Sequence, residues 1–191
     1  MKYPNGIKQT ATNHNINYGN RGMTLEEDLN ITNKYYEDEG IAYIYKKPTP
    51  IQIVKVSYPT NKQVRITDAF FKEPSTLDYN GLYKGYYIDF DAKETNNTTS
   101  FPLGNINPHQ INHIRNISNN GGLCFLIIRF NKLDITYLLL GEDFIDFIDN
   151  NTRKSIPVDY FKEKAFSIEL KYNPRLDYLK IIDKIIGGRN G

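Results

Sequence analysis

From Thr76 to Lys93 the chain reads TLDYNGLYKGYYIDFDAK, and this stretch decides the fold. Asp78 stands before a predicted turn that contains Gly81, and an apolar strand from Gly85 to Asp91 follows. The strand ends in a carboxylate, one small residue and a lysine. Successive side chains of a strand point to opposite faces, so Asp89, Asp91 and Lys93 are expected to share one face of a sheet.

This grouping suits one kind of chemistry, the metal-dependent hydrolysis of a phosphodiester. That reaction needs an activated water, neutralisation of an anionic transition state and support for the departing oxygen, much of which Mg²⁺ can supply. Asp78 and Asp91 are the expected Mg²⁺ ligands, because hard cations prefer oxygen. Lys93 is expected to orient the water or stabilise the developing charge, and Asp89 to be a spare ligand or a supporting group. Taken singly, the same residues also fit a plain turn and a polar strand end.

Three more residues are candidates for the same site. Gln110 is predicted either to cap a helix or to give its amide oxygen to the metal, and one side chain cannot fully do both. Thr76 is either an ordinary strand residue or an oxygen donor to the cation. Glu26, on the first predicted helix, is either a solvent-facing glutamate or an additional carboxylate.

Two other signals favour a plain interpretation. His109 and His113 have the helical spacing of a zinc-protease pair, but Gln110 stands where that motif needs a glutamate, and the sequence offers no evident third ligand. The single cysteine, Cys124, lies in an apolar segment and is expected to be an inert core thiol.

The rest of the chain predicts a mixed β-sheet flanked by helices. A helix is expected from Thr24, which forms a capping box with Glu27, to a stop at Gly40. A second helix is expected to open at Asn107, with Pro108 at its first position, and to stop at 121–122. Strands are predicted at 41–45, 51–57, 64–71, 85–91, 123–130 and 134–140, and helical segments at 142–148, 158–164 and 176–186.

Composition sets broader limits. The chain has 191 residues and a net charge of +2, which fits one domain and does not by itself demand a nucleic-acid partner. No apolar run reaches the roughly 18 to 20 residues that cross a bilayer, and one cysteine suits a reducing cytoplasm. Residues 1–20 are predicted to be a mobile arm, 21–187 a single domain and 188–191 a flexible tail.

Eight blocks of the sequence carry a resemblance to a known family. The blocks are NRGMTLE (20–26), KKPTPIQIV (46–54), DYNG (78–81), YKG (83–85), AKET (92–95), TSFPL (99–103), HQI (109–111) and PRLDY (174–178). On these blocks the chain resembles the RecU Holliday junction resolvases, members of the restriction-endonuclease-like superfamily, over nearly its whole length.

The resemblance implies a homodimeric, restriction-endonuclease-like nuclease domain that cuts four-way DNA junctions by paired symmetrical nicks in recombination and repair. It implies that Lys93 stabilises the transition state and that the hairpin 51–71 is a stalk projecting toward the junction. A RecA-type recombinase is a further implied partner. The implied Mg²⁺ positions are Thr76, Asp78, Asp91 and Gln110, and the basic residues in the matching blocks that are expected to bind DNA are Arg21, Lys46, Lys47 and Lys84.

One departure from the family pattern leaves other functions open. The family usually has Glu where this chain has Asp91, and the shorter side chain changes where the carboxylate sits. A non-catalytic junction-binding protein that modulates a recombinase is therefore the first alternative. A restriction-type nuclease acting on linear duplex is the second.

Overall fold

The structure is a computed structural model that describes residues 23–60, 63–72 and 76–189. The predicted arm at 1–20 lies outside the described residues, as do Arg21 and the last two residues of the predicted tail. Residues 188 and 189 continue the last helix of the chain. The domain boundaries stay predictions.

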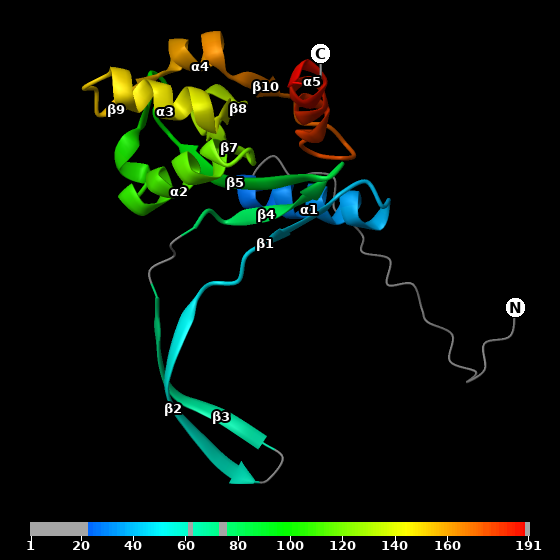
Figure 1. Ribbon diagram of the computed structural model, residues 1–191, viewed down its shortest axis with the longest axis vertical. Helices are drawn as coiled ribbons and strands as arrows, with labels where there is room; N and C mark the ends of the chain where they lie inside the picture. The colour runs from blue at the N-terminus through cyan, green and yellow to red at the C-terminus, as the bar shows by residue number, and fades with distance from the viewer. Residues whose placement is uncertain (1–22, 61–62, 73–75, 190–191) are drawn as a thin grey trace, which may run out of the picture.

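A six-stranded mixed sheet forms the centre of the body (Figure 1). Its order is β1-β4-β5-β7-β8-β10, with β5 and β7 parallel and the other neighbours antiparallel. This architecture confirms the predicted α/β class. The strands are β1 (Tyr43–Lys46), β4 (Tyr79–Tyr83), β5 (Tyr86–Thr95), β7 (Leu123–Phe130), β8 (Ile135–Leu140) and β10 (Phe166–Ile168).

Helices cover both faces of this sheet, and a separate apolar core lies between the sheet and the helices on each face. Leu29 of α1 and Ile182 of α5 belong to one core, whereas Ile114 of α2, Phe144 of α3 and Phe161 of α4 belong to the other. The helices are α1 (Leu25–Asp38), α2 (Pro108–Asn119), α3 (Gly141–Asn150), α4 (Val158–Lys164) and α5 (Leu179–Arg189).

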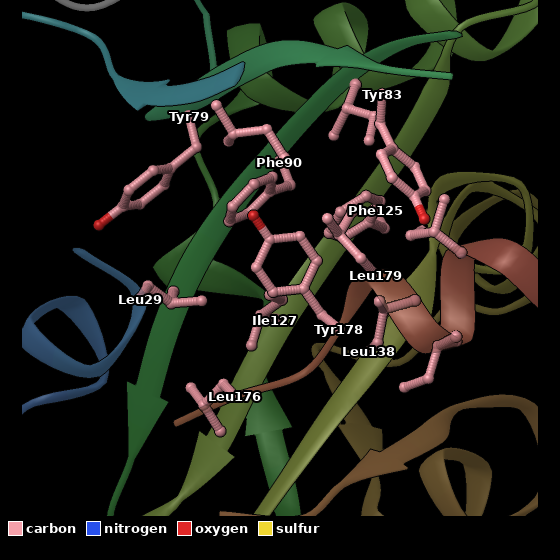
Figure 2. Close-up of a cluster of buried hydrophobic side chains, with 14 of the residues drawn as sticks. Leu29, Tyr79, Tyr83, Phe90, Phe125, Ile127, Leu138, Leu176, Tyr178 and Leu179 are labelled. Atoms are coloured by element: carbon pink, nitrogen blue, oxygen red, sulfur yellow. The ribbon is translucent and has the colours of Figure 1, made fainter. Parts of the chain in front are cut away.

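Strand β5 serves both cores by alternation. Its residues Ile88 and Phe90 are fully buried toward α1 and α5, and Figure 2 shows Phe90 between Tyr79 and Phe125 in that cluster. The Phe90 ring stacks on each of these two rings at a centroid distance of 4.8 Å. Asp89 and Asp91, which alternate with these two residues along β5, therefore point to the opposite face, where α2 packs.

Both predicted helix starts are confirmed. The Thr24 hydroxyl accepts from the Glu27 backbone N–H at 3.2 Å, and a Glu27 carboxylate oxygen accepts from the Thr24 N–H at 2.8 Å. Pro108 opens α2 directly after its cap residue Asn107. These caps satisfy N–H groups that would otherwise lack partners at a helix start, and the second cap fixes the part of α2 nearest β5.

The predicted turn around Gly81 is wrong, because residues Tyr79–Tyr83 form β4. The close approach of β1 requires glycine at position 81 of this strand, because a Cβ there would stand 2.1 Å from the Tyr43 carbonyl oxygen. The turn comes later, at Lys84 and Gly85, which both have positive φ angles. Glycine here indicates a close approach within a sheet rather than a turn.

The predicted hairpin is present as β2 (Ile51–Thr60) and β3 (Gln63–Phe71), an antiparallel pair. Every residue of the two strands is exposed except the half-buried Ser57. Figure 1 shows the ribbon reaching away from the body. Its role as a stalk that meets DNA stays a prediction.

Short elements escaped the sequence prediction. They are β6 (Ser100–Pro102), which pairs with β9 (Ser155–Pro157), the sheet strand β10 and two 3₁₀ turns, η1 (Leu103–Asn105) and η2 (Asn131–Leu133). Helix α5 starts at Leu179 rather than near 176, since Leu176 forms an isolated bridge with Leu170. Cys124 is buried on β7 as predicted, and burial raises the pKa of its thiol well above the usual range.

Among the described residues, no helix combines the length and apolar character that crossing a membrane requires.

Candidate active site

The register of β4 and β5 brings the first two predicted ligands together. Tyr79 of β4 pairs with Phe90 of β5, so Asp78, one residue before β4, comes opposite Asp91, one residue after Phe90. Asp91 is fully buried, whereas Asp78 is half-buried and lines an open cavity of about 470 Å³ together with Thr76. The two carboxylates predicted from the sequence therefore meet at one place.

The Asp91 carboxylate is held by three donors. Lys93 Nζ lies 2.8 Å from Asp91 Oδ2, and Gln110 Nε2 donates to the same oxygen at 2.6 Å. The other oxygen accepts from the Ala92 backbone N–H at 2.8 Å. Lys93 points to the face of Asp91, as its spacing predicted, and its ammonium lies at the carboxylate.

Burial and, to a lesser extent, the neighbouring Asp78 carboxylate together raise the pKa of Asp91 to about 6, although Lys93 pulls it down. One lysine does not offset burial and a second carboxylate, so the site has an excess of negative charge. A perturbed carboxylate of this kind beside a cavity is a functional-site signal. The arrangement would bind one more cation favourably.

Gln110 caps its helix. Its side-chain oxygen accepts from the Asn107 backbone N–H at 3.1 Å, and its amide nitrogen faces Asp91. The capping alternative is therefore the arrangement that the structure has. Ligation of a metal by the Gln110 oxygen requires rotation of the amide, and this role stays a prediction.

Asp89 occupies a second polar cluster rather than the one at Asp91. Lys47 Nζ lies 3.0 Å from each Asp89 carboxylate oxygen. The Tyr87 hydroxyl donates to Asp89 Oδ2 at 2.8 Å, and His113 Nε2 lies 2.9 Å from the same atom. Sequence reasoning did not connect these residues. A matched spacing could have predicted the contact between Asp89 and His113, since His113 follows Gln110 by one helical turn and Asp89 precedes Asp91 by one strand repeat.

The basic residues expected to bind DNA are mostly in ion pairs. Lys46 pairs with Glu26 at 2.6 Å, so this exposed glutamate contacts a lysine and not the Asp91 cluster. Lys84 pairs with Asp183 at 2.6 Å. Arg21 lies outside the described residues. Contact of Lys46, Lys47 and Lys84 with DNA stays a prediction.

The structure gives no support to a zinc site at the two histidines. His113 contacts Asp89, and the described part of the chain holds no group of three or more His, Cys, Asp or Glu side chains placed to bind a metal. The Asp78 and Asp91 pair is a different kind of donor set. Two carboxylates with a nearby hydroxyl and amide fit a hard, oxygen-seeking cation better than zinc.

Fold and site together define a class of protein, a mixed α/β protein with an Asp…Asp-x-Lys centre on its central sheet, as metal-dependent nucleases have. Comparison with known proteins narrows the class. The family model described as RecU, "Recombination protein U", matches residues 20–184, and the chain belongs to this family. This confirms the resemblance in the sequence.

Curated relatives cover nearly the whole chain. A Holliday junction resolvase RecU from Pediococcus pentosaceus is 50% identical over 196 residues, which span 97% of this chain and 98% of the relative. A protein of the same name from Staphylococcus aureus strain JH9 is 49% identical over 200 residues, spanning 97% and 96%.

Proposed function

We propose that the protein is an endonuclease that resolves four-way Holliday junctions in recombination and repair. The observation that carries this is the meeting of Asp78, Asp91 and Lys93 beside an open cavity. The names of the full-length relatives support the same reaction. The cut is the hydrolysis of a phosphodiester in each of two strands.

A divalent cation, Mg²⁺ in the finer proposal, fits this site. Asp78 and Asp91 would hold it, with Thr76 as a further oxygen donor and Gln110 after rotation of its amide. When bound, it would offset negative charge on the phosphate and lower the pKa of a bound water. The raised pKa of Asp91 supports the fit, because a nearby cation relieves the repulsion that raises it.

The chain's own residues have defined tasks in the cut. Lys93, whose ammonium lies 2.8 Å from Asp91, would contact the attacking water or a phosphate oxygen and stabilise the charge that develops there. Gln110 orients Asp91 from the start of α2. Because Asp91 is fully buried and anchored by the Ala92 N–H, its position does not depend on solvent.

A homodimer is proposed to deliver the paired nicks. A four-way junction has approximate two-fold symmetry, and a two-fold protein offers it two equal sites. The exposed apolar side chains of β2 and β3, such as Val54, Tyr58 and Phe70, support an interaction surface on the hairpin. Contact with a RecA-type recombinase and a cytoplasmic location stay predictions.

The test is a cleavage assay on an end-labelled four-way junction and on linear duplex of the same sequence. Mg²⁺ and EDTA arms are run with the wild type, Asp78→Ala and Lys93→Ala. We expect symmetrical nicks on the junction alone, dependent on Mg²⁺ and lost in both variants. Cutting of linear duplex with no preference for branches would replace this proposal with a restriction-type nuclease.

A second candidate is a junction-binding protein that does not cut. The contacts of Asp91 favour it, because Lys93 and Gln110 already occupy the carboxylate that a cation would need. Tight binding of the junction without nicks in Mg²⁺ would support this candidate. An Asp91→Glu variant that gains nicking would locate the cause at that residue.

A further inference from the structure

A cavity of about 470 Å³ lies where the β2–β3 hairpin joins the body. Two backbone bonds tie its walls together: the Lys47 N–H donates to the Asp78 carbonyl at 2.7 Å, and the Lys72 N–H donates to the Pro50 carbonyl at 2.9 Å. The cavity is lined by residues 45–50 on one side and by Lys72, 76–78 and Asn80 on the other. It therefore shares Asp78 with the candidate active site.

Lysines outnumber carboxylates in the lining of this cavity. Lys46, Lys47 and Lys72 line it, against Asp78 as its one lining carboxylate among the described residues. Glu26 partly offsets Lys46. Lys72 is exposed at the end of the hairpin. An anion in the cavity would meet the Lys72 ammonium and the Lys47 ammonium, which Asp89 also binds, beside the Asp78 carboxylate.

Lys47 is the unusual member, because a buried carboxylate fixes it. Asp89 is fully buried and binds the ammonium with both oxygens at 3.0 Å. Tyr87 and His113 in turn hold Asp89. An ammonium has three donors, so this arrangement leaves Lys47 one donor. Its side chain is 20% exposed and lines the cavity, which makes that donor available to a ligand.

We propose that this cavity binds a DNA backbone phosphate next to the scissile one, with Lys47 as its fixed contact, Lys72 as its second contact and Asp89 as the residue that positions Lys47. The proposal rests on the proposed function, since it supposes a strand whose scissile phosphate lies at Asp78 and Asp91. Neighbouring phosphates of a strand are one sugar apart, so such a strand brings a second phosphate to the adjoining cavity.

Fixing Lys47 has a physical purpose in this arrangement. A free lysine side chain loses much rotamer entropy when it binds a phosphate, and Asp89 makes it lose that entropy on folding instead. A reacting phosphate that is misplaced by about 1 Å can lose up to about 10²-fold in rate. Asp89 is thus a positioning residue, and its effect should appear in the rate of cutting more than in affinity.

The first measurement is the salt dependence of junction binding in EDTA. The wild type, Lys47→Met and Lys72→Met are compared from low to high NaCl. Removing one lysine from a phosphate makes the fall of log K with log salt shallower by about 0.9, so we expect each variant to be flatter by about that amount. Lys162→Met is the matched control. It removes a lysine paired with Asp159 on α4, and its slope should equal that of the wild type. Equal slopes for all four proteins would overturn the phosphate site.

The second measurement is the single-turnover nicking rate in Mg²⁺ at saturating junction. Asp89→Asn should keep its salt slope, because Lys47 is retained, but should cut about tenfold more slowly. Adding Asp89→Asn to Lys47→Met should slow cutting no further, since Asp89 acts through Lys47. A slower rate in the double variant than in Lys47→Met would overturn the positioning role, as would an unchanged rate in Asp89→Asn.

Further controls distinguish failure of the phosphate site from loss of folding and from failure of the proposed function. Lys47→Met leaves a buried carboxylate unpaired, whereas the double variant with Asp89→Asn does not, and Lys72 is exposed. Thermal unfolding of each variant shows which ones fold. A wild type that binds junctions but does not nick them would remove the proposed function, and the salt slopes in EDTA would still decide the phosphate site.

Discussion

A buried aspartate lies on each face of the sheet, and the two carboxylates have opposite electrostatic surroundings. Asp28 of α1 is bound by two guanidinium groups: Arg129 Nη2 lies 2.6 Å from one of its oxygens, and Arg175 donates to the other. Asp91 of β5 has one lysine, one amide and a second carboxylate beside it. Both carboxylates are at most 1% exposed.

The difference separates charge that supports the fold from charge that supports chemistry. At Asp28 the positive groups outnumber the carboxylate, and each has its partner in place. At Asp91 burial and a second carboxylate oppose ionisation, and the raised pKa records what the ionised carboxylate costs the folded state. A site that binds a cation must keep its carboxylates together, so stability is given up at one centre and retained at the other.

Asp28→Ala should have the largest effect and should act on the fold. It leaves two nearly buried guanidinium groups, 12% and 13% exposed, without their carboxylate. We expect the free energy of unfolding to fall by about 3–5 kcal/mol, measured by urea denaturation in EDTA. A fall below about 1 kcal/mol would break the comparison.

Lys93→Met should act on chemistry instead. Removal of one group that stabilises the transition state lowers rates by about 10²–10³-fold, and we expect a fall of that size in the single-turnover nicking of a junction. Junction affinity in EDTA should change little, because Lys93 is occupied by Asp91 before the cation binds. An equal fall in affinity and in rate would assign Lys93 to binding.

Asp91→Asn should remove a pH dependence of stability that distinguishes the Asp91 site from the Asp28 centre. The folded Asp91 has a pKa of about 6, against an ordinary value of 3.8. Between about pH 4 and pH 6 the folded state thus holds more protons than the unfolded state, and wild-type stability should fall as pH rises, by of order 1–3 kcal/mol in total. The variant should lack this fall.

The measurement is urea unfolding in EDTA at several pH values from about 4.5 to 7.5, a range that spans the titration of the folded Asp91. Asp28→Asn serves as the companion variant, because it changes the other buried carboxylate and should leave the fall across this pH window in place. A wild type whose stability is flat from about pH 4.5 to 6.5 would contradict the excess of negative charge at Asp91.

Lys34→Met should have the smallest effect. Lys34 pairs with Glu37 and Asp38 on the exposed side of α1 at 3.4 and 2.6 Å. Exposed pairs of this kind contribute little to stability, so we expect the midpoint of thermal unfolding to stay within error of the wild type. A clear drop would show that surface pairs on α1 matter as much as the Asp28 centre.

Much of the fold and the site could be predicted from the sequence. Both helix caps, the apolar strands and the shared face of Asp91 and Lys93 follow from local patterns, because capping and strand alternation depend on residues close in the chain. The approach of Asp78 to Asp91 depends instead on the register of β4 against β5. Gly81 misled the prediction, since what it permits is the approach of β1, a segment that lies much earlier in the chain.

The Asp89 cluster also could not be predicted from local sequence patterns. Lys47, Asp89 and His113 come from three segments, the loop after β1, the strand β5 and the helix α2. Alternation places Asp89 on the face of Asp91, but only the packing of α2 against that face decides which carboxylate meets Gln110 and which meets His113. Information of this kind lies in the tertiary arrangement.

The buried thiol on β7 provides an experimental handle on the site. Cys124 is the single cysteine of the chain and pairs in register with Asp89 across the parallel strands. A thiol-reactive dye can reach it only when the centre of the sheet opens, so the rate of labelling reports the kinetics of that opening. Adding a divalent cation should slow the dye reaction if the ion stabilises the closed sheet, and the native chain would then report cation binding without any introduced cysteine.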